Sequence, residues 1–189
     1  MDASRLILAS TSPYRRALLA RLALPFTQHA PDFEELPPGS LPVSELVRAN
    51  TLGKARNVLV QHPAARVIAS DQLAICDDRV LGKPGSSAAA EAQLRAIAGR
   101  QVSFYTGVAL LSAHESHYAL ERYHVEMRSL TDAEIATYVQ RDQPLHCAGS
   151  FKSEGLGIAL FARMWGDDPT ALIGLPLIRL SHWLQPLRC

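Results

Sequence analysis

The chain has 189 residues, of which 48% are hydrophobic and 20% are charged. A chain of this size buries about 70% of its unfolded surface in one core. We therefore expect a single domain over residues 1–189 and exclude a mainly disordered protein. The formal net charge of +1 argues against a nucleic-acid partner or an anionic membrane surface, because both usually require an excess of basic residues.

Cysteines and long apolar runs are both scarce. Cys76, Cys147 and Cys189 are odd in number and widely separated, which favours neither a disulfide framework nor a structural zinc site. The apolar runs are far shorter than the ~20 residues of a membrane span. The N-terminus lacks the apolar core and cleavage region of a signal peptide. We therefore expect a cytoplasmic protein with no membrane partner.

The predicted elements alternate between strand and helix in the first half of the chain. In order, they are a buried strand over 5–9, a helix from Ser12-Pro13 to the Pro25 region, a helix over 41–61, a strand over 67–76 and a helix over 87–98. Two long strands follow, over 101–111 and 118–128, with a hairpin-like turn between them. A helix with a capping box begins at Thr131, and a last helix covers 175–187. This pattern predicts an α/β fold with a mixed sheet.

The segment 10–16 is the first candidate site. It carries three hydroxyl residues and the adjacent arginines Arg15 and Arg16. A predicted strand delivers it to a helix N-terminus, whose free N–H groups and positive dipole attract anions. Ser10, Ser12 and the two arginines could together hold several phosphate oxygens. The alternative is an ordinary capped helix whose arginines are solvated.

Two further segments place single charged residues near strand ends or loops. Asp71 follows the apolar run 67–69, at a position where α/β proteins often carry catalytic groups, and a carboxylate there can bind a hard cation or activate water. Lys83 stands on a Gly/Pro loop and has a point charge suited to phosphate. The alternatives are a turn aspartate and a solvated turn lysine. Lys54 lies inside a predicted helix, where most lysines are solvated, so its position indicates a phosphate-binding role even less strongly.

The segment 145–155 is the fourth candidate, with two glycines and an aromatic residue in a polar stretch. Glu154 has no basic residue four positions on, so its carboxylate is available to a ligand. His146 and Cys147 fit structural roles better than catalytic ones, because no triad-like partner accompanies them. Taken together, these residues indicate an α/β protein that handles a phosphorylated small molecule.

Motifs spread over nearly the whole chain resemble, in order, those of the Maf family of nucleoside triphosphate pyrophosphatases. They cover residues 6–16, 30–35, 54–55, 70–72, 81–84, 104–107, 147–155 and 173–177. Within the family, Gln72 and the run Ser153-Glu154-Gly155 resemble the YceF-type branch, which acts on 7-methyl-GTP. The branch that acts on dTTP and UTP typically carries Asp-Thr and Ile-Gln-Gly at these places. Tyr14 departs from the branch pattern, in which tryptophan occurs.

The resemblance implies a Maf/HAM1-like fold, with an elongated mixed β-sheet flanked by helices and two lobes around a central cleft. It also implies hydrolysis of 7-methyl-GTP to 7-methyl-GMP and pyrophosphate, as house-cleaning of modified nucleotides. Asp71 is then the general base, and Asp71 and Glu35 are the candidate ligands of a divalent metal cation, Mg²⁺ or Mn²⁺. The expected triphosphate-binding residues are Ser10, Ser12, Arg15, Arg16, Lys54 and Lys83, and the expected specificity residues are Tyr14, Gln72 and Glu154.

Two alternatives remain from the sequence. One is the same chemistry on dTTP or UTP, and the other is a nucleotide-binding regulator of cell division with little turnover. The presence of Asp71 and Glu35 favours an enzyme, since a pure binder needs no general base. Homodimers are common among such proteins, but the sequence identifies no interface.

Overall fold

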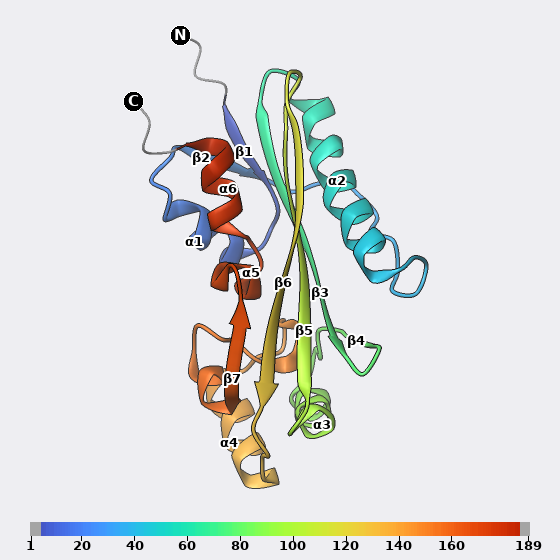
Figure 1. Ribbon diagram of the computed structural model, residues 1–189, viewed down its shortest axis with the longest axis vertical. Coiled ribbons are helices and arrows are strands. Elements are labelled where there is room, and N and C mark those ends of the chain that lie inside the picture. Colours follow the sequence, from blue (N-terminus) through green and yellow to red (C-terminus); the bar gives the residue numbers. More distant parts are fainter. Residues whose placement is uncertain (1–4, 186–189) are drawn as a thin grey trace. The chain divides into compact units, whose positions relative to one another are not determined.

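The computed structural model describes residues 5–185 and has an α/β fold (Figure 1). The elements of the first half are β1 (Leu6–Ala9), α1 (Pro13–Ala20), β2 (Phe26–His29), α2 (Val43–Gln61), β3 (Arg66–Cys76), β4 (Arg79–Leu81) and α3 (Ser87–Ile97). The second half contains β5 (Gln101–Leu111), β6 (Ser116–Met127), α4 (Asp132–Asp142), the 3₁₀ turns η1 (Ala148–Ser150) and η2 (Leu156–Leu160), β7 (Phe161–Gly166), α5 (Pro169–Ile173) and α6 (Leu177–Leu184).

The strands form one mixed sheet in the order β2-β1-β3-β5-β6-β7, with β4 paired to β3. β1 runs parallel to both of its neighbours, with Leu6 opposite Phe26 on one side and Arg66 on the other. β4 and β7 run antiparallel to β3 and β6. The predicted α/β class with a mixed sheet flanked by helices is therefore confirmed.

The described residues divide into two compact units. Unit 1 consists of residues 5–72, 106–121 and 174–185, and unit 2 of residues 73–105 and 122–173. The long strands β3, β5 and β6 contribute residues to both units. No helix in the span 5–185 is long and apolar enough to cross a membrane.

In unit 1, alternate residues of the strands face two different helical layers. Val67 and Ala69 share a buried cluster with Ala55 and Val58 of α2. Residues of the opposite parity face the C-terminal part of the chain, since Arg66 donates to the carbonyl of Trp183. Figure 1 accordingly shows α2 and α6 on opposite sides of these strands. Asp71, two residues after Ala69, also faces α2, and this places it against Lys54 of that helix.

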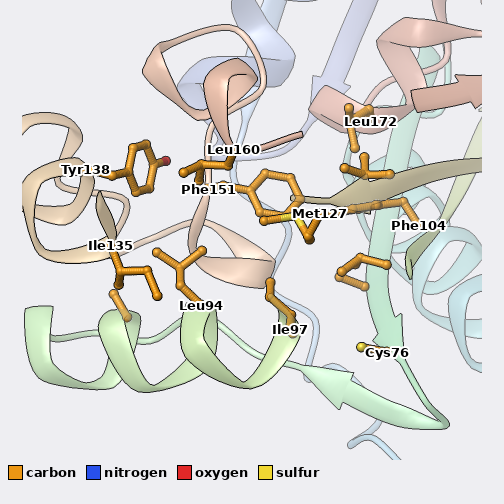
Figure 2. Packing of buried hydrophobic residues seen from close by; sticks show 14 of the residues in the cluster. Cys76, Leu94, Ile97, Phe104, Met127, Ile135, Tyr138, Phe151, Leu160 and Leu172 are labelled. Carbon is orange, nitrogen blue, oxygen red and sulfur yellow. The ribbon is translucent and has the colours of Figure 1, made fainter. Parts of the chain in front are cut away.

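Unit 2 has its own apolar core, shown in Figure 2. One side consists of strand residues, and the other of side chains from α3 and α4. The labelled members are Cys76, Leu94, Ile97, Phe104, Met127, Ile135, Tyr138, Phe151, Leu160 and Leu172. Burial raises the pKa of the Cys76 thiol, so this cysteine behaves as a core residue. The core anchors α4 and the segment after it, which carries Glu154.

Several elements differ from those expected. The strands β2, β4 and β7 and the short helix α5 were not predicted, because their sequences lack an alternating or continuous apolar run. In β7, all residues after Phe161 are exposed, as is typical of an edge strand. The last helix begins at Leu177, later than expected, and ends at Leu184, earlier than expected. Cys189 lies outside the described residues.

Candidate functional site

Lys54 joins two carboxylates at the centre of the candidate site in unit 1. Its Nζ lies 2.6 Å from Asp71 Oδ1 and 2.6 Å from Glu35 Oε1. The side chains of Lys54 and Asp71 are only 8% and 7% exposed, whereas that of Glu35 is 57% exposed. The site therefore has a buried side formed by α2 and β3 and an accessible side formed by the segment before α2.

Two asparagines of α2 hold the backbone on either side of Glu35. Asn57 accepts from the N–H of Asp32 and donates to its carbonyl, at 2.9 and 2.7 Å. Asn50 does the same at Leu36, at 2.8 and 3.2 Å. Positions 50, 54 and 57 are separated by four and three residues, so they lie on one face of the helix. The two asparagines therefore place Glu35 over Lys54.

Gly53 lets the same segment approach α2 closely. A Cβ atom at this position would lie 2.2 Å from the ring of Phe33, so any larger residue would displace the ring. A glycine inside a helix usually has a packing reason, and this is the sequence signal that could have revealed the contact. The sequence did not predict that Asn50, Asn57 or Gly53 supports the site.

The N-terminus of α1 is built as expected from Ser12 and Pro13. Ser12 is the N-cap residue, and its Oγ accepts from the N–H of Arg15 at 3.3 Å. Ser10, which is 5% exposed, accepts from the N–H of Ser12 at 3.1 Å. Both hydroxyl groups therefore shape the turn into the helix. A bound anion would meet a first turn that contains no acidic residue.

The two arginines of α1 differ in environment. Arg15 donates from Nε to the carbonyl of Gly174 at 2.9 Å. Burial lowers the pKa of its guanidinium, and the nearby charges of Asp71 and Glu35 oppose this change. The N–H of Arg16 donates to the carbonyl of Ser12 at 3.2 Å, but its side chain is exposed and has no hydrogen-bond or ion-pair partner within residues 5–185. Arg15 thus belongs electrostatically to the carboxylate cluster, while Arg16 can reach a ligand from solvent.

The remaining unit 1 candidates are Ser70 and Gln72, which flank Asp71 in the middle of β3 and not near a strand end as expected, and Tyr14 of α1. Ser70 is fully buried, and its Oγ lies 2.7 and 2.8 Å from the carbonyl oxygens of Gly107 and Gly174, which share its single hydroxyl proton. Gln72 is half-buried and donates to Thr106 Oγ1 at 2.9 Å. Tyr14 is half-buried in the first turn of α1. The Ser70 bonds keep Gly174, and with it the acceptor of Arg15, against the strand that carries Asp71.

Lys83 and Glu154 both belong to unit 2 and are exposed. Their loops are tied together by Gln93 of α3, which the sequence did not predict. Gln93 donates to the carbonyl of Gly82 at 3.3 Å and accepts from Ser150 Oγ at 2.6 Å. One amide side chain therefore connects the residue before Lys83 with the loop that leads to Glu154.

The donor set at Asp71 and Glu35 fits a hard divalent cation. Both residues offer carboxylate oxygens, the ligands that Mg²⁺ prefers. The described chain contains no group of three or more His, Cys, Asp or Glu residues placed to hold a metal ion. Two carboxylates suit Mg²⁺ at a phosphate site, because this ion usually takes its other ligands from water and substrate phosphates.

Comparisons with known proteins identify the family of this chain. The family described as Maf-like protein matches residues 5–187. A protein of Chromohalobacter salexigens named 7-methyl-GTP pyrophosphatase is 49% identical over 184 residues, covering 96% of this chain and 95% of its own. A protein of the same name from Nitrosococcus oceani is 50% identical over 182 residues, covering 95% of this chain and 92% of its own. Another from Vibrio cholerae is 45% identical over 188 residues, covering 98% of this chain and 96% of its own.

Among solved structures, the Staphylococcus aureus Ham1 protein has a similar fold. The TM-score is 0.56 at 13% sequence identity, and the match covers 98% of this chain and 100% of that one. At this identity the likeness concerns the fold alone. The match of the family over nearly the whole chain, together with relatives at 45–50% identity, shows that the chain belongs to the Maf family.

Proposed function

We propose that this protein is a nucleoside triphosphate pyrophosphatase that hydrolyses 7-methyl-GTP to 7-methyl-GMP and pyrophosphate. The observation that carries the proposal is the buried contact of Lys54 with Asp71, next to Glu35 and Arg15, in one unit of the chain. Relatives at 45–50% identity carry the name 7-methyl-GTP pyrophosphatase. The physiological role would be the removal of modified nucleotides.

In the proposed reaction, Asp71 is the general base. A water oxygen attacks the α-phosphorus, Asp71 takes the water proton, and the bond to the oxygen bridging the α- and β-phosphates breaks. Pyrophosphate leaves with the electron pair of that bond. Phosphoryl chemistry depends mainly on positioning and on charge stabilisation, so cations around the triphosphate are the main requirement.

This chain supplies those cations from three elements. Arg15 and Arg16 stand at the N-terminus of α1, Lys54 on α2 and Lys83 on the loop after β4. Ser10 and Ser12 shape the turn from which Arg15 and Arg16 extend, because Ser10 accepts from the N–H of Ser12 and Ser12 accepts from the N–H of Arg15. A divalent ion held by Asp71 and Glu35 would offset phosphate charge and lower the pKa of water.

Glu154 is the proposed reader of the base. Guanine presents an N1–H donor and an N2–H₂ donor on one edge, and a carboxylate can accept from both. Methylation at N7 makes the purine cationic, which favours a nearby carboxylate and adds a cation–π contribution of about 0.5–2 kcal/mol if the base stacks on Tyr14. Gln72 is the third proposed specificity residue.

Pyrophosphate release by the purified protein tests the proposal directly. Activity is measured with Mg²⁺ or Mn²⁺ on 7-methyl-GTP, GTP, dTTP, UTP and CTP. The expected result is the highest kcat/KM on 7-methyl-GTP. A preference for pyrimidine nucleotides would leave the enzyme class in place but reject the substrate. Nucleotide binding without any turnover would reject the enzyme in favour of a sensor.

The variant Glu154→Gln tests the role of this residue in specificity. It keeps the size of the side chain, but its amide can accept only one of the two guanine donors. We expect a loss of about 10-fold or more in the ratio of kcat/KM between 7-methyl-GTP and UTP. Glu91→Gln is the matched control, because Glu91 lies on α3 of the same unit and its side chain has no hydrogen-bond or ion-pair partner among the described residues. An unchanged ratio in Glu154→Gln would exclude Glu154 as the base reader.

A further inference from the structure

Lys152 lies two residues before Glu154, and all of its polar groups are directed into unit 2. Its Nζ donates to the backbone carbonyl of Asp142 and lies 3.9 Å from Asp142 Oδ1. Its N–H donates to Tyr138 Oη at 3.0 Å. Its carbonyl accepts from the N–H of Gly155 at 3.2 Å. A lysine in a nucleotide-binding motif would ordinarily be assigned to phosphate, but this one contacts the protein.

The acceptor of Lys152 is the C-terminal end of α4. Asp142 is the last residue of this helix, which ends at Gln143 in the left-handed conformation. Carbonyls in the last turn of a helix lack intrahelical partners, and the helix dipole favours a cation there. Asp142 Oδ2 is buried and has no hydrogen-bond partner, so the Lys152 charge also compensates a carboxylate that solvent reaches poorly.

The bond from Gly155 to Lys152 closes a turn with Ser153 and Glu154 at its central positions. The turn packs tightly against its surroundings. A Cβ atom at Gly155 would lie 3.2 Å from Asp142 Oδ1, and one at Gly157 would lie 2.4 Å from the carbonyl oxygen of Lys152. The backbone of the turn is therefore fixed by Lys152, and the exposed Glu154 side chain projects from it.

We propose that Lys152 is a positioning residue for substrate specificity, which fastens the turn that presents Glu154 to the C-terminus of α4. Tyr138 and Asp142 supply the fixed side of this attachment. The inference rests on the proposed role of Glu154 in reading the base. Lys152 itself does not touch the substrate, so its removal changes how well one base is recognised and does not weaken triphosphate binding in general.

The variant Lys152→Met tests the inference, with Lys152→Arg as the conservative variant. Steady-state pyrophosphate release is measured on 7-methyl-GTP and UTP. For Lys152→Met we expect KM for 7-methyl-GTP to rise about 10-fold, with kcat and the KM for UTP changed by less than about 2-fold, because a contact made equally in ground and transition states affects KM alone. Lys152→Arg should restore most of the loss, since a guanidinium can donate to the same carbonyl.

A double variant separates positioning from general destabilisation. Once Glu154→Gln has removed the carboxylate, adding Lys152→Met should raise KM for 7-methyl-GTP by less than about 2-fold. Arg163→Met is the control, because Arg163 is paired with Glu126 in the same unit and should leave the nucleotide ranking unchanged. An equal rise of KM for both nucleotides in Lys152→Met would overturn the inference and assign Lys152 to the triphosphate.

Tyr138→Phe provides a test if Lys152→Met does not fold. It removes the acceptor of the Lys152 N–H but keeps the ring in the core, and it should raise KM for 7-methyl-GTP selectively. If the folded Tyr138→Phe variant shows no selective rise of KM for 7-methyl-GTP, the inference is contradicted. If Glu154→Gln alters the ranking but the folded Lys152 and Tyr138 variants do not, only this inference fails. If Glu154→Gln leaves the ranking unchanged, the proposed base reader fails first.

Discussion

The Nζ of Lys54 lies 2.6 Å from Asp71 Oδ1, and both side chains are less than a tenth exposed. This contact joins α2 to β3 across 17 residues of sequence. Breaking a buried pair by removing one member is strongly destabilising, because the other charge remains buried without compensation. The pair is therefore both a structural joint of unit 1 and the centre of its candidate site.

Lys54→Met should lower the free energy of unfolding by about 3 kcal/mol or more at pH 7. Adding Asp71→Asn should recover part of the loss, because the buried charge is then removed as well. Urea denaturation provides the measurement. Arg95→Met is the control, since its pair with Asp132 is exposed on both sides and should contribute less than about 1 kcal/mol. An equal loss of unfolding free energy in Lys54→Met and Arg95→Met would contradict the interpretation that the Lys54–Asp71 pair is buried and stabilising.

Asp71→Asn should reduce kcat for pyrophosphate release by about 100-fold or more, because the amide cannot take the proton of the attacking water. Nucleotide affinity, measured by calorimetry, should change little. The amide keeps the size of the side chain and can still accept from Lys54. Turnover close to that of the wild type would remove Asp71 from the role of base.

Asn57→Ala tests the attachment of the Glu35 segment to α2. It removes both hydrogen bonds to Asp32 but keeps those of Asn50 to Leu36, so Glu35 should be held less firmly over Lys54. If Glu35 is a metal ligand, the Mg²⁺ concentration for half-maximal activity should rise several-fold. Arg56→Ala is the neighbouring control, since the Arg56 side chain is exposed and has no hydrogen-bond or ion-pair partner in the part of the chain that the structure describes. An equal rise of the Mg²⁺ concentration for half-maximal activity in both variants would refute the role of Asn57 in holding the Glu35 segment.

Gly107→Ala should destabilise unit 1 by crowding. The added Cβ would lie 2.5 Å from Thr51 Oγ1 and 2.8 Å from Val47 Cγ1, and overpacking of this kind typically costs about 1–3 kcal/mol. Gly82→Ala is the control, because nothing lies within 4 Å of its Cβ position. Thermal unfolding of the two variants measures the difference. Adding Val47→Ala to Gly107→Ala should recover part of the loss.

The capping box of α4 predicts a dependence of stability on pH. Hydrogen bonds from the backbone N–H of Thr131 and from Arg128 lower the pKa of Glu134 to about 2. The unfolded chain binds the proton more readily than the folded one, so this contribution is present above the ordinary pKa of about 4.5 and is lost as the pH falls toward 2. Glu134→Gln should therefore differ from the wild type in urea denaturation at pH 6 and converge with it near pH 2.

Interactions between near neighbours in the chain were accessible from the sequence. The cap at Ser12 and the capping box of Thr131 and Glu134 form as predicted, because each is made within a single helical turn. The ordered motifs indicated the Maf family, and the comparisons confirm it. The edge strand β7 was missed, because only its pairing with β6 makes it a strand.

Only the tertiary structure decided which candidate residues meet. It brings Lys54, Asp71 and Glu35 together and places Arg15 in their electrostatic field, whereas the roles of Lys83 and Glu154 remain proposals. It also shows that Lys152 faces the end of α4. The direction of a lysine ammonium depends on acceptors distant in sequence. The chain alone therefore specified the residue types of the site, and strand pairing and helix packing selected their partners.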